Sequence, residues 1–266
     1  MSSKTAICYC VHDDHTFLGA SLSSYVAGLP IYVFVSEVAW DGSSGDWLSS
    51  SAIAKAHSCK VITGRWQSEE DHRRAAFDYL SKEGFGYVFI PDSDEVIEHR
   101  LLDTLCTIAE QHLADRVYVT WDTYWGPIDE RTAYVIRPRE GFNPALLINL
   151  EQAQYDGVRN FSSGRPLLLT GEHGIVHHLS YAGPAERIRR KISTYGHRDE
   201  VRARWYEAVY EQWHYDKLMQ NLHPTHPEAY RFAERIYVPA ELAQRLSEGE
   251  ELTARALKNL KEPVAV

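Results

Sequence analysis

The feature that most constrains the fold is an alternation between short apolar runs and helical patterns over the first hundred residues. The apolar runs are compact and rich in β-forming residues, and they lie at 5–11, 31–36, 60–63 and 87–90. The helical patterns between them lie at about 16–27, 46–57 and 68–83. Strands that are apolar on both faces and are separated by helices form βαβ units around a parallel sheet. The first part of the chain is therefore predicted to have an α/β fold.

The pattern changes in the second part of the chain. A predicted helix at about 99–113 is followed by runs typical of antiparallel or mixed strands, at 116–126, 132–138 and 145–150. From Pro184 to the end the pattern is mostly helical, at about 184–195, 199–220 and 226–260. We therefore expect a mostly parallel central sheet with a mixed second half over 1–183, and a helical C-terminal extension over 184–266 packed on it.

Charge and composition exclude several classes of function. The chain has 266 residues and a formal net charge of −9, which argues against nonspecific binding to nucleic acid or to anionic lipid by charge alone. No apolar run approaches the roughly 20 residues that span a bilayer, and the N-terminus lacks the pattern of a secretory signal. The four cysteines show no C-x-x-C spacing and are typical of buried thiols in a reduced compartment. A cytoplasmic protein without a transmembrane segment is expected.

An acidic stretch directly follows the fourth apolar run. Asp92 and Asp94 flank Ser93 in "PDSDE" (91–95), at the end of a predicted buried strand. In open parallel sheets, ligands bind beyond the carboxyl ends of the strands. Two carboxylates two residues apart can share a divalent cation there, and oxygen ligands suit Mg²⁺ or Mn²⁺. The alternative is a solvated turn with Asp92 as a helix N-cap, but the position after the fourth strand favours the metal site.

A second constellation lies in "GIVHHLSYAGPAERIRRKISTYGH" (174–197). His177 and His178 are adjacent on a predicted strand, so their side chains point to opposite faces and only one can enter a given site. The helix that follows carries Arg187, Arg189, Arg190 and Lys191. These residues either form a solvated face, paired with Glu186, or hold phosphate.

The residues in these segments resemble a family. "GYVFIPDSDEVIEHRLLDTL" (86–105) is similar to the strand, D-x-D motif and following helix of family-two glycosyltransferases with the GT-A fold. The segment 174–197 resembles the H-x-S-Y motif and Lys-bearing helix of small bacterial members, including those acting on cell-surface glycans. "SEEDHRRAAFDYL" (68–80) occupies the place of a helix that carries a family Arg, and 10–36 matches the opening strand, helix and second strand. The resemblance covers roughly residues 5–200, and it is the order and spacing of the motifs that make it specific.

This resemblance implies a metal-dependent glycosyltransferase that inverts the anomeric centre of the sugar, with Mn²⁺ or Mg²⁺ on the diphosphate of a nucleotide sugar. Asp92 and Asp94 would hold the metal with His178 as third ligand and His177 as its alternative. The residues placed at the nucleotide sugar are His12, Asp13, Ser36, Trp66, Arg74, Asp92 and Ser93. Residues 1–98 would form the nucleotide-binding half and 99–183 the acceptor half of the catalytic domain. Glu95 is expected to cap or orient rather than to bind.

An inverting transfer needs a carboxylate that takes the proton of the acceptor hydroxyl. Glu172, just before the two histidines, is the candidate for this base, and an exposed turn carboxylate is the alternative interpretation of that residue. Asp122 and Asp156 are weaker candidates for the same role.

Aromatic side chains follow the D-x-D motif where a GT-A acceptor lies. "TWDTYWG" (120–126) contains Trp121, Tyr124 and Trp125, and such rings stack on the C–H faces of sugars. Core packing explains at least one of them equally well. The expected partners are therefore a nucleotide-diphosphate sugar donor and a glycan or other hydroxyl acceptor, with no nucleic acid.

Two other functions remain as alternatives. "VHDDHTFLG" (11–19) resembles the opening motif of zinc-dependent N-acetylglucosaminyl deacetylases, and "HPTH" (223–226) offers further histidines. In that motif, however, a proline is missing here and the spacing is one residue too long, and the acids at 92–95 would have no role. The second alternative is a GT-A-like domain that binds a nucleotide sugar or glycan without turnover.

Overall fold

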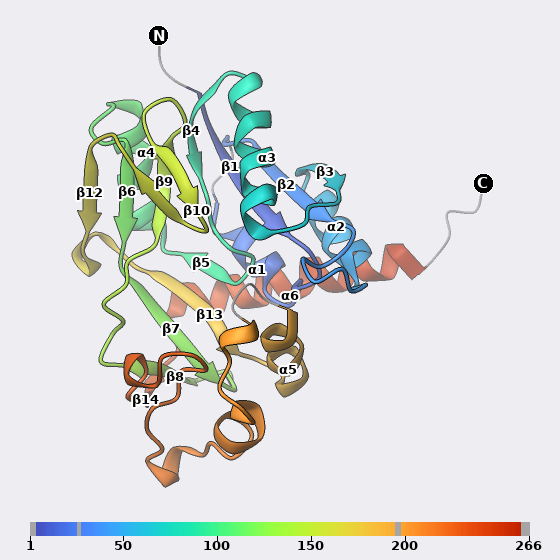
Figure 1. The fold of residues 1–266 in the computed structure, drawn as a ribbon, viewed down its shortest axis with the longest axis vertical. Coiled ribbons are helices and arrows are strands. Elements are labelled where there is room, and N and C mark those ends of the chain that lie inside the picture. The colour runs from blue at the N-terminus through green and yellow to red at the C-terminus, as the bar shows by residue number, and fades with distance from the viewer. Residues whose placement is uncertain (1–3, 26–27, 195–197, 262–266) are drawn as a thin grey trace.

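A mostly parallel sheet forms the centre of the computed structural model, which describes residues 4–25, 28–194 and 198–261 (Figure 1). The strand order is β12-β6-β9-β4-β1-β2-β3. The strands are β1 (Lys4–Val11), β2 (Ile31–Ser36), β3 (Lys60–Gly64), β4 (Phe85–Phe89), β6 (Arg116–Val119), β9 (Ala145–Asn149) and β12 (Pro166–Leu169). β1 runs parallel to β2 and β4, β2 to β3 and β6 to β12, whereas β9 is antiparallel to both of its neighbours. The predicted α/β fold with a mixed second half is confirmed.

Alternate residues of the central strands face two separate cores. Along β1, Ile7 and Tyr9 face one core and Ala6 and Cys8 face the other. The first core also receives side chains from α1 (Leu18–Ser23), α2 (Trp47–Ala56) and α4 (His99–Glu110). The second core is covered by α3 (Glu69–Lys82) and by the hairpin of β10 (Gln154–Gly157) and β11 (Asn160–Ser162). The side-chain oxygen of Ser68 accepts the amide of Asp71, so α3 begins at the predicted capping residue.

A second sheet lies beside the first, below it in Figure 1, and has the strand order β14-β8-β7-β13-β5. Its strands are β5 (Glu95–Ile97), β7 (Trp121–Gly126), β8 (Thr132–Arg137), β13 (Val176–Ala182) and β14 (Phe232–Tyr237). β5 directly follows the acids at the end of β4, and β13 pairs with both β5 and β7. The pairing brings His178 next to Glu95 and Thr123, so segments more than fifty residues apart meet at one place.

The C-terminal extension is less helical than the sequence pattern predicts. Its described residues, 184–194 and 198–261, contain two α-helices, α5 (Ala185–Thr194) and α6 (Ala240–Lys261). The predicted helices at 199–220 and 226–260 are replaced, up to residue 239, by short helical turns and the strand β14. The turns lie at Arg198–Glu200, Tyr206–Tyr210, Tyr215–Lys217 and Pro227–Ala229.

Two physical causes explain this correction for the part of the segment beyond residue 220. Proline has no amide hydrogen and clashes with the preceding helical turn, and Pro224, Pro227 and Pro239 interrupt the segment. The strand β14 also completes the edge of the second sheet by pairing along the whole of β8. Parts of the helical predictions and of the quoted motif lie outside the described residues, at positions 26–27, 195–197 and 262–266.

The helix α6 packs against α1 and α2, crossing beneath the first sheet in Figure 1. Its closest approach is made by two glycines, Gly249 of α6 and Gly19 of α1. A Cβ on Gly249 would lie 2.3 Å from the backbone nitrogen of Ala20. The C-terminal extension therefore contacts the parallel half of the fold through a backbone-to-backbone contact that tolerates no side chain. Neither α6 nor any other described helix has an apolar stretch long enough to cross a bilayer.

Substitution of Gly249 tests this contact. We expect Gly249→Ala to lower the free energy of unfolding by about 1–2 kcal/mol, because overpacking costs more than the roughly 1 kcal/mol that alanine gains in a helix. Urea denaturation measures the change. Gly141→Ala is the control, since a Cβ there meets nothing within 4 Å. Wild-type stability of Gly249→Ala would show that α6 does not approach α1 as closely as described.

Candidate functional site

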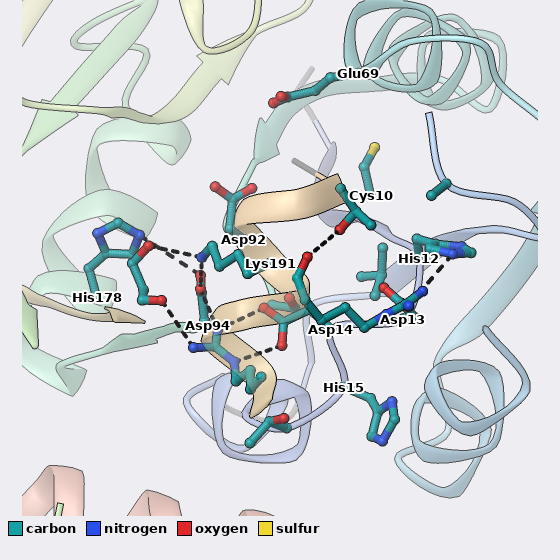
Figure 2. A pocket seen from close by; sticks show the side chains of 18 of the residues that line it. Cys10, His12, Asp13, Asp14, His15, Glu69, Asp92, Asp94, His178 and Lys191 are labelled. Carbon is teal, nitrogen blue, oxygen red and sulfur yellow. Dashed lines mark hydrogen bonds and ion pairs between the residues drawn. The ribbon is translucent and has the colours of Figure 1, made fainter. Parts of the chain in front are cut away.

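A pocket of about 620 Å³ opens at the carboxyl ends of the parallel strands. It lies at the end of β1, which has β2 on one side and β4 on the other. The chain leaves β1 toward β2 and β3 and later returns to the opposite side of β1 as β4, so the strand order reverses at this point. Crevices at such points are the usual ligand sites of open α/β sheets. Residues 10–16 after β1 and 92–94 after β4 line the pocket, and α5 supplies further side chains (Figure 2).

Asp92 is held by two arginines. Arg73 of α3 donates to its Oδ1 at 2.6 Å, and Arg159 donates to its Oδ2 at 3.3 Å. Arg159 also pairs with the buried carboxylate of Glu95 and donates to the carbonyl of Ala145. Burial raises the pKa of Asp92, but Arg73 and Arg159 outweigh it and lower the pKa below its ordinary value. Asp92 is therefore an ionised carboxylate whose two oxygens both already have cationic partners.

Asp94 has different partners, and they come from α5. The Nζ of Lys191 lies 2.6 Å and the Nη2 of Arg187 lies 2.8 Å from its Oδ2. Its other oxygen, Oδ1, lies 3.9 Å from the Nε2 of His178. Burial opposes ionisation, but Lys191 and Arg187 lower the pKa of Asp94 far below its ordinary value. Asp94 is thus a charged carboxylate with one oxygen in ion pairs and the other turned toward an imidazole.

One face of α5 supplies three cations to the pocket. Arg187, Arg190 and Lys191 are spaced at i, i+3 and i+4, so they share a helix face. Arg187 also clamps Asp14 with two hydrogen bonds, at 2.8 and 2.7 Å, and Arg190 pairs with Asp13. Arg189 lies on a solvated face, since its side chain is 56% exposed and does not line the pocket, whereas Arg190 lines the pocket with a side chain that is 44% exposed.

His178 enters the pocket and His177 does not. The ring of His178 is stacked on the indole of Trp121, with centroids 4.1 Å apart and planes at 7°. Burial lowers the pKa of His178 to about 4, so the imidazole is neutral near pH 7. His177 is fully buried on the opposite face of β13, where its Nδ1 is hydrogen bonded to the hydroxyl of Tyr124. The geometry therefore favours His178 of the two histidines considered from the sequence.

The fit of a divalent metal differs for the three predicted ligands. The Nε2 of His178 and the Oδ1 of Asp94 face each other and form a nitrogen–oxygen donor pair of the kind that Mn²⁺ accepts. Both oxygens of Asp92, by contrast, are engaged by guanidinium groups. Over the described ranges, no group of three or more His, Cys, Asp or Glu side chains is arranged for a metal. The donor set thus fits a metal held by Asp94 and His178 whose remaining ligands come from a bound molecule or water.

The structure brings together seven of the residues predicted for the site. The pocket is lined by His12, Asp13, Asp92, Ser93, Asp94, Trp121 and His178. Figure 2 shows His178, Asp94 and Lys191 close together on one side and His12 and Asp13 on the other. The side chains of Ser36, Trp66, Arg74, Tyr124, Trp125 and Glu172 are not part of the lining.

Three predicted nucleotide-sugar contacts are corrected by local packing. Arg74 is 51% exposed and pairs with Glu70, whereas Arg73 is buried and reaches Asp92. The hydroxyl of Ser36 donates to the carbonyl of Val38 and closes a local turn. Trp66 is stacked on the ring of His72, with centroids 4.0 Å apart, and so it packs against α3 instead of facing the pocket.

The other predicted contact residues, Tyr124, Trp125 and Glu172, do not line the pocket either. Tyr124 and Trp125 are fully buried, and Trp125 packs against Trp205 and Tyr210 in a core beneath the second sheet. Their side chains cannot contact an acceptor. Glu172 lies in an exposed turn, Gly171–His173, so its alternative interpretation as a turn carboxylate fits the structure.

The two weaker candidates for the catalytic base, Asp122 and Asp156, also lie outside the pocket lining. Asp122 is held by Arg137 and Arg139. Asp156 is exposed on β10 and does not line the pocket.

Several lining residues were not predicted for the site. Arg73 could have been found, because it precedes Ala76, Phe77 and Leu80 by three, four and seven residues and therefore lies on the buried face of α3. Arg159, in the turn between β10 and β11, carries no sequence signal. Two exposed apolar side chains, Phe142 and Val158, also line the pocket, and the ring of Phe142 lies beside Trp121.

The contrast between the two adjacent arginines can be tested directly. We expect Arg73→Lys to lower the free energy of unfolding by about 1.5–3 kcal/mol, because lysine cannot keep the hydrogen bonds to both Glu69 and Asp92. Arg74→Lys should change it by less than about 0.5 kcal/mol, since the pair with Glu70 is exposed. Urea denaturation of the two variants gives the comparison. Equal effects of both substitutions would contradict the described phase of α3.

The chain has an α/β fold with a mixed, largely parallel sheet and a C-terminal helix, and the solved structures that it resembles include nucleotide-diphospho-sugar transferases. No family model matches the sequence, and no curated protein sequence matches it either. One similar structure is S. aureus TarS, with 15% identity, a TM-score of 0.36, and coverage of 45% of this chain and 22% of TarS.

Two further structures are similar to parts of the chain. A fragment of S. aureus TarS solved in complex with UDP-GlcNAc shares 13% identity, with a TM-score of 0.33, over 44% of this chain and 35% of the fragment. A protein from Desulfovibrio desulfuricans G20, assigned as a nucleotide-diphospho-sugar transferase, shares 11% identity, with a TM-score of 0.40, over 66% of this chain and 82% of its own. The chain thus spans about a fifth of TarS and about a third of the TarS fragment. Function is inferred below from the side chains of the pocket.

Proposed function

We propose that this protein is a metal-dependent glycosyltransferase of the family-two type, which moves a sugar from a nucleotide-diphosphate sugar to a hydroxyl acceptor with inversion. The observation that carries the proposal is the convergence of Asp94, His178 and Lys191 in one pocket. These residues come from two distant parts of the chain, the segment after β4 and the consecutive elements β13 and α5. They combine a carboxylate, a neutral imidazole and a cation at the ligand end of a parallel sheet. That combination suits a metal-bound diphosphate.

The charge of the pocket supports a metal as well as an anion. Five cationic residues line it, namely Arg73, Arg159, Arg187, Arg190 and Lys191, together with six acidic ones, Asp13, Asp14, Glu69, Asp92, Asp94 and Glu186. The lining therefore has no excess of positive charge. A diphosphate would add further negative charge, and a divalent cation balances it.

Within this proposal, Asp94 and His178 would hold the metal, and Asp92 would orient the site through Arg73 and Arg159. A bound Mn²⁺ or Mg²⁺ supplies electrostatic stabilisation to the leaving diphosphate. Lys191 and Arg187 place cationic hydrogen-bond donors beside the Oδ2 of Asp94. Such fixed donors stabilise the negative charge that would develop on the leaving diphosphate. Their pairing with Asp94 keeps both side chains in place before a ligand binds.

The acceptor side of the pocket is apolar. Trp121 is stacked on His178 and lies beside the exposed ring of Phe142, and the exposed Val158 also lines the pocket. Aromatic and aliphatic surfaces suit the C–H faces of a sugar ring, so a glycan or another acceptor with an apolar face would enter there. Within this proposal, Trp121 would contact the acceptor, as the sequence predicts.

A thermal-shift screen tests the proposal. Nucleotide-diphosphate sugars are added with Mn²⁺ or with EDTA, and a ligand that binds only the native state raises the melting temperature. We expect at least one nucleotide sugar to raise the melting temperature with Mn²⁺ and to have a smaller effect with EDTA. If no nucleotide sugar in the screen raises the melting temperature, the proposal is contradicted. Equal rises in melting temperature with Mn²⁺ and with EDTA would contradict only its metal dependence.

A further inference from the structure

We infer that Thr123 and Glu140 are positioning residues that hold His178 in one tautomer, with its proton on Nδ1 and a bare Nε2 facing Asp94. The inference concerns residues that the sequence did not single out. It rests on the proposed function only for its purpose, which is to keep the Nε2 lone pair available to a metal. The tautomer itself is a property of the metal-free protein and can be measured without any ligand.

Three side chains form a continuous hydrogen-bonded chain behind the pocket. The Oγ1 of Thr123 lies 3.3 Å from the Nδ1 of His178, and the same hydroxyl donates to the Oε1 of Glu140 at 2.5 Å. Thr123 is almost fully buried on β7, next to His178 on β13. Glu140 follows β8, and its side chain does not line the pocket. The chain of hydrogen bonds therefore runs from His178 through buried Thr123 to the half-buried Glu140, away from the pocket lining.

The direction of this chain follows from the number of available protons. A threonine hydroxyl has one hydrogen, and an ionised carboxylate only accepts hydrogen bonds. Since Thr123 donates its hydrogen to Glu140, its oxygen must accept from the ring of His178. The proton of the neutral imidazole then lies on Nδ1, and Nε2 keeps its lone pair.

The surroundings act on both ends of this chain. Burial raises the pKa of Glu140 above its ordinary value, and hydrogen bonding with Thr123, Tyr230 and Trp121 offsets only part of that rise, so the tautomer is measured at pH 8, which favours the ionised carboxylate. The stack on Trp121 fixes the plane of the imidazole ring, and within that plane the hydrogen bond with Thr123 holds Nδ1 on its side of the ring. The Nε2 atom, 3.9 Å from the Oδ1 of Asp94, then faces the position that the metal would occupy.

A hydrogen bond of this kind matters because metals bind only the bare nitrogen. Imidazole ligands usually donate their second ring N–H to another protein group, and loss of that group typically weakens metal binding by about 10–100-fold. Without the Thr123 hydroxyl, a share of the molecules would carry the proton on Nε2. Thr123 and Glu140 thus act on the site through His178 without touching a substrate.

Nitrogen NMR of ¹⁵N-histidine-labelled, metal-free protein at pH 8 tests the inference. The signals of His178 are assigned by their loss in His178→Gln. We expect protonated Nδ1 and bare Nε2 in the wild type and in Thr123→Ser, which keeps the hydroxyl, and a mixture of tautomers in Thr123→Val. Thr120→Val is the control, because the hydroxyl of Thr120 donates to the carbonyl of Leu169. Glu140→Gln, whose amide can donate back to Thr123, is a second variant if Thr123→Val does not fold.

Calorimetric titration with Mn²⁺ provides a second measurement on the same proteins. Thr123→Val should bind Mn²⁺ about 10–100-fold more weakly than the wild type, and Thr123→Ser should restore the affinity. A proton on Nε2 in the wild type, or an unchanged tautomer in both Thr123→Val and Glu140→Gln, would overturn the inference. If the wild type binds Mn²⁺ neither alone nor with a nucleoside diphosphate, the metal part of the proposed function fails, while the NMR result still decides the tautomer.

Discussion

Asp94→Asn is expected to lower kcat/KM for sugar transfer by at least about 100-fold, which corresponds to about 2.7 kcal/mol of transition-state stabilisation. The substitution keeps the size of the side chain but removes the charge that pairs with Lys191 and Arg187 and that would bind the proposed metal. It also replaces the oxygen that faces His178 with a weaker ligand. The measurement is steady-state kinetics of transfer, or of donor hydrolysis, with the nucleotide sugar identified in the thermal-shift screen.

The control for this variant is Asp103→Asn, because Asp103 lies on α4 with a side chain that is 65% exposed. It should retain wild-type kinetics. The melting temperature of Asp94→Asn must be measured as well, since the substitution leaves Arg187 and Lys191 with fewer ion-pair partners. Undiminished activity in a folded Asp94→Asn protein would rule out the proposed role of this carboxylate.

Arg187→Met is expected to cause the largest loss of stability, about 3–5 kcal/mol in the free energy of unfolding. The guanidinium of Arg187 is 6% exposed and holds Asp14 and Asp94 together. It also donates to the backbone carbonyls of residues 179, 180 and 182. Its removal leaves buried carboxylates and carbonyl groups without these donors. Urea denaturation gives the magnitude, and Arg189→Met on the exposed face of the same helix should change it by less than about 0.5 kcal/mol.

The pH dependence gives a further check on Arg187. The cations around Asp94 lower its pKa in the folded state, so its ionisation contributes stability above the unfolded pKa of about 4. That contribution is lost as the pH falls toward the lower, folded-state pKa. The difference between the wild type and Arg187→Met should therefore be largest near neutral pH and shrink below about pH 4. A difference that stays constant with pH would show that Arg187 acts mainly through packing.

The parallel half of the fold could be predicted because its signals are local and repeated. The β1 run is apolar at every position that faces either core, and Ser68 marks the beginning of α3. The C-terminal extension could not be predicted in this way. The formation of β14 depends on the free edge of β8, which lies about a hundred residues earlier in the sequence. A helical pattern in such a segment is overridden by pairing that no local window contains.

In the candidate site, too, some residues could be predicted from a local sequence signal and others could not. The position of Asp92 and Asp94 after a buried strand is a local signal, and the strand delivers both to the pocket. The choice between His177 and His178 is not local, because every residue of β13 is buried and alternation alone cannot show which face meets the pocket. The partner of Asp92 also depends on the turn that carries Arg159, sixty-seven residues away. These assignments required the three-dimensional arrangement of the two sheets.

The central claim, that Asp94 and His178 bind a metal-bound diphosphate, is tested most directly by calorimetric titration of a nucleoside diphosphate. The titration is performed with Mn²⁺ and with EDTA, on the wild type and on His178→Gln. Binding to the wild type should be at least about tenfold tighter with Mn²⁺, a difference of about 1.4 kcal/mol, and His178→Gln should lose most of that difference. Binding that is equally tight with EDTA, or a Mn²⁺ effect that persists in His178→Gln, would contradict the claim.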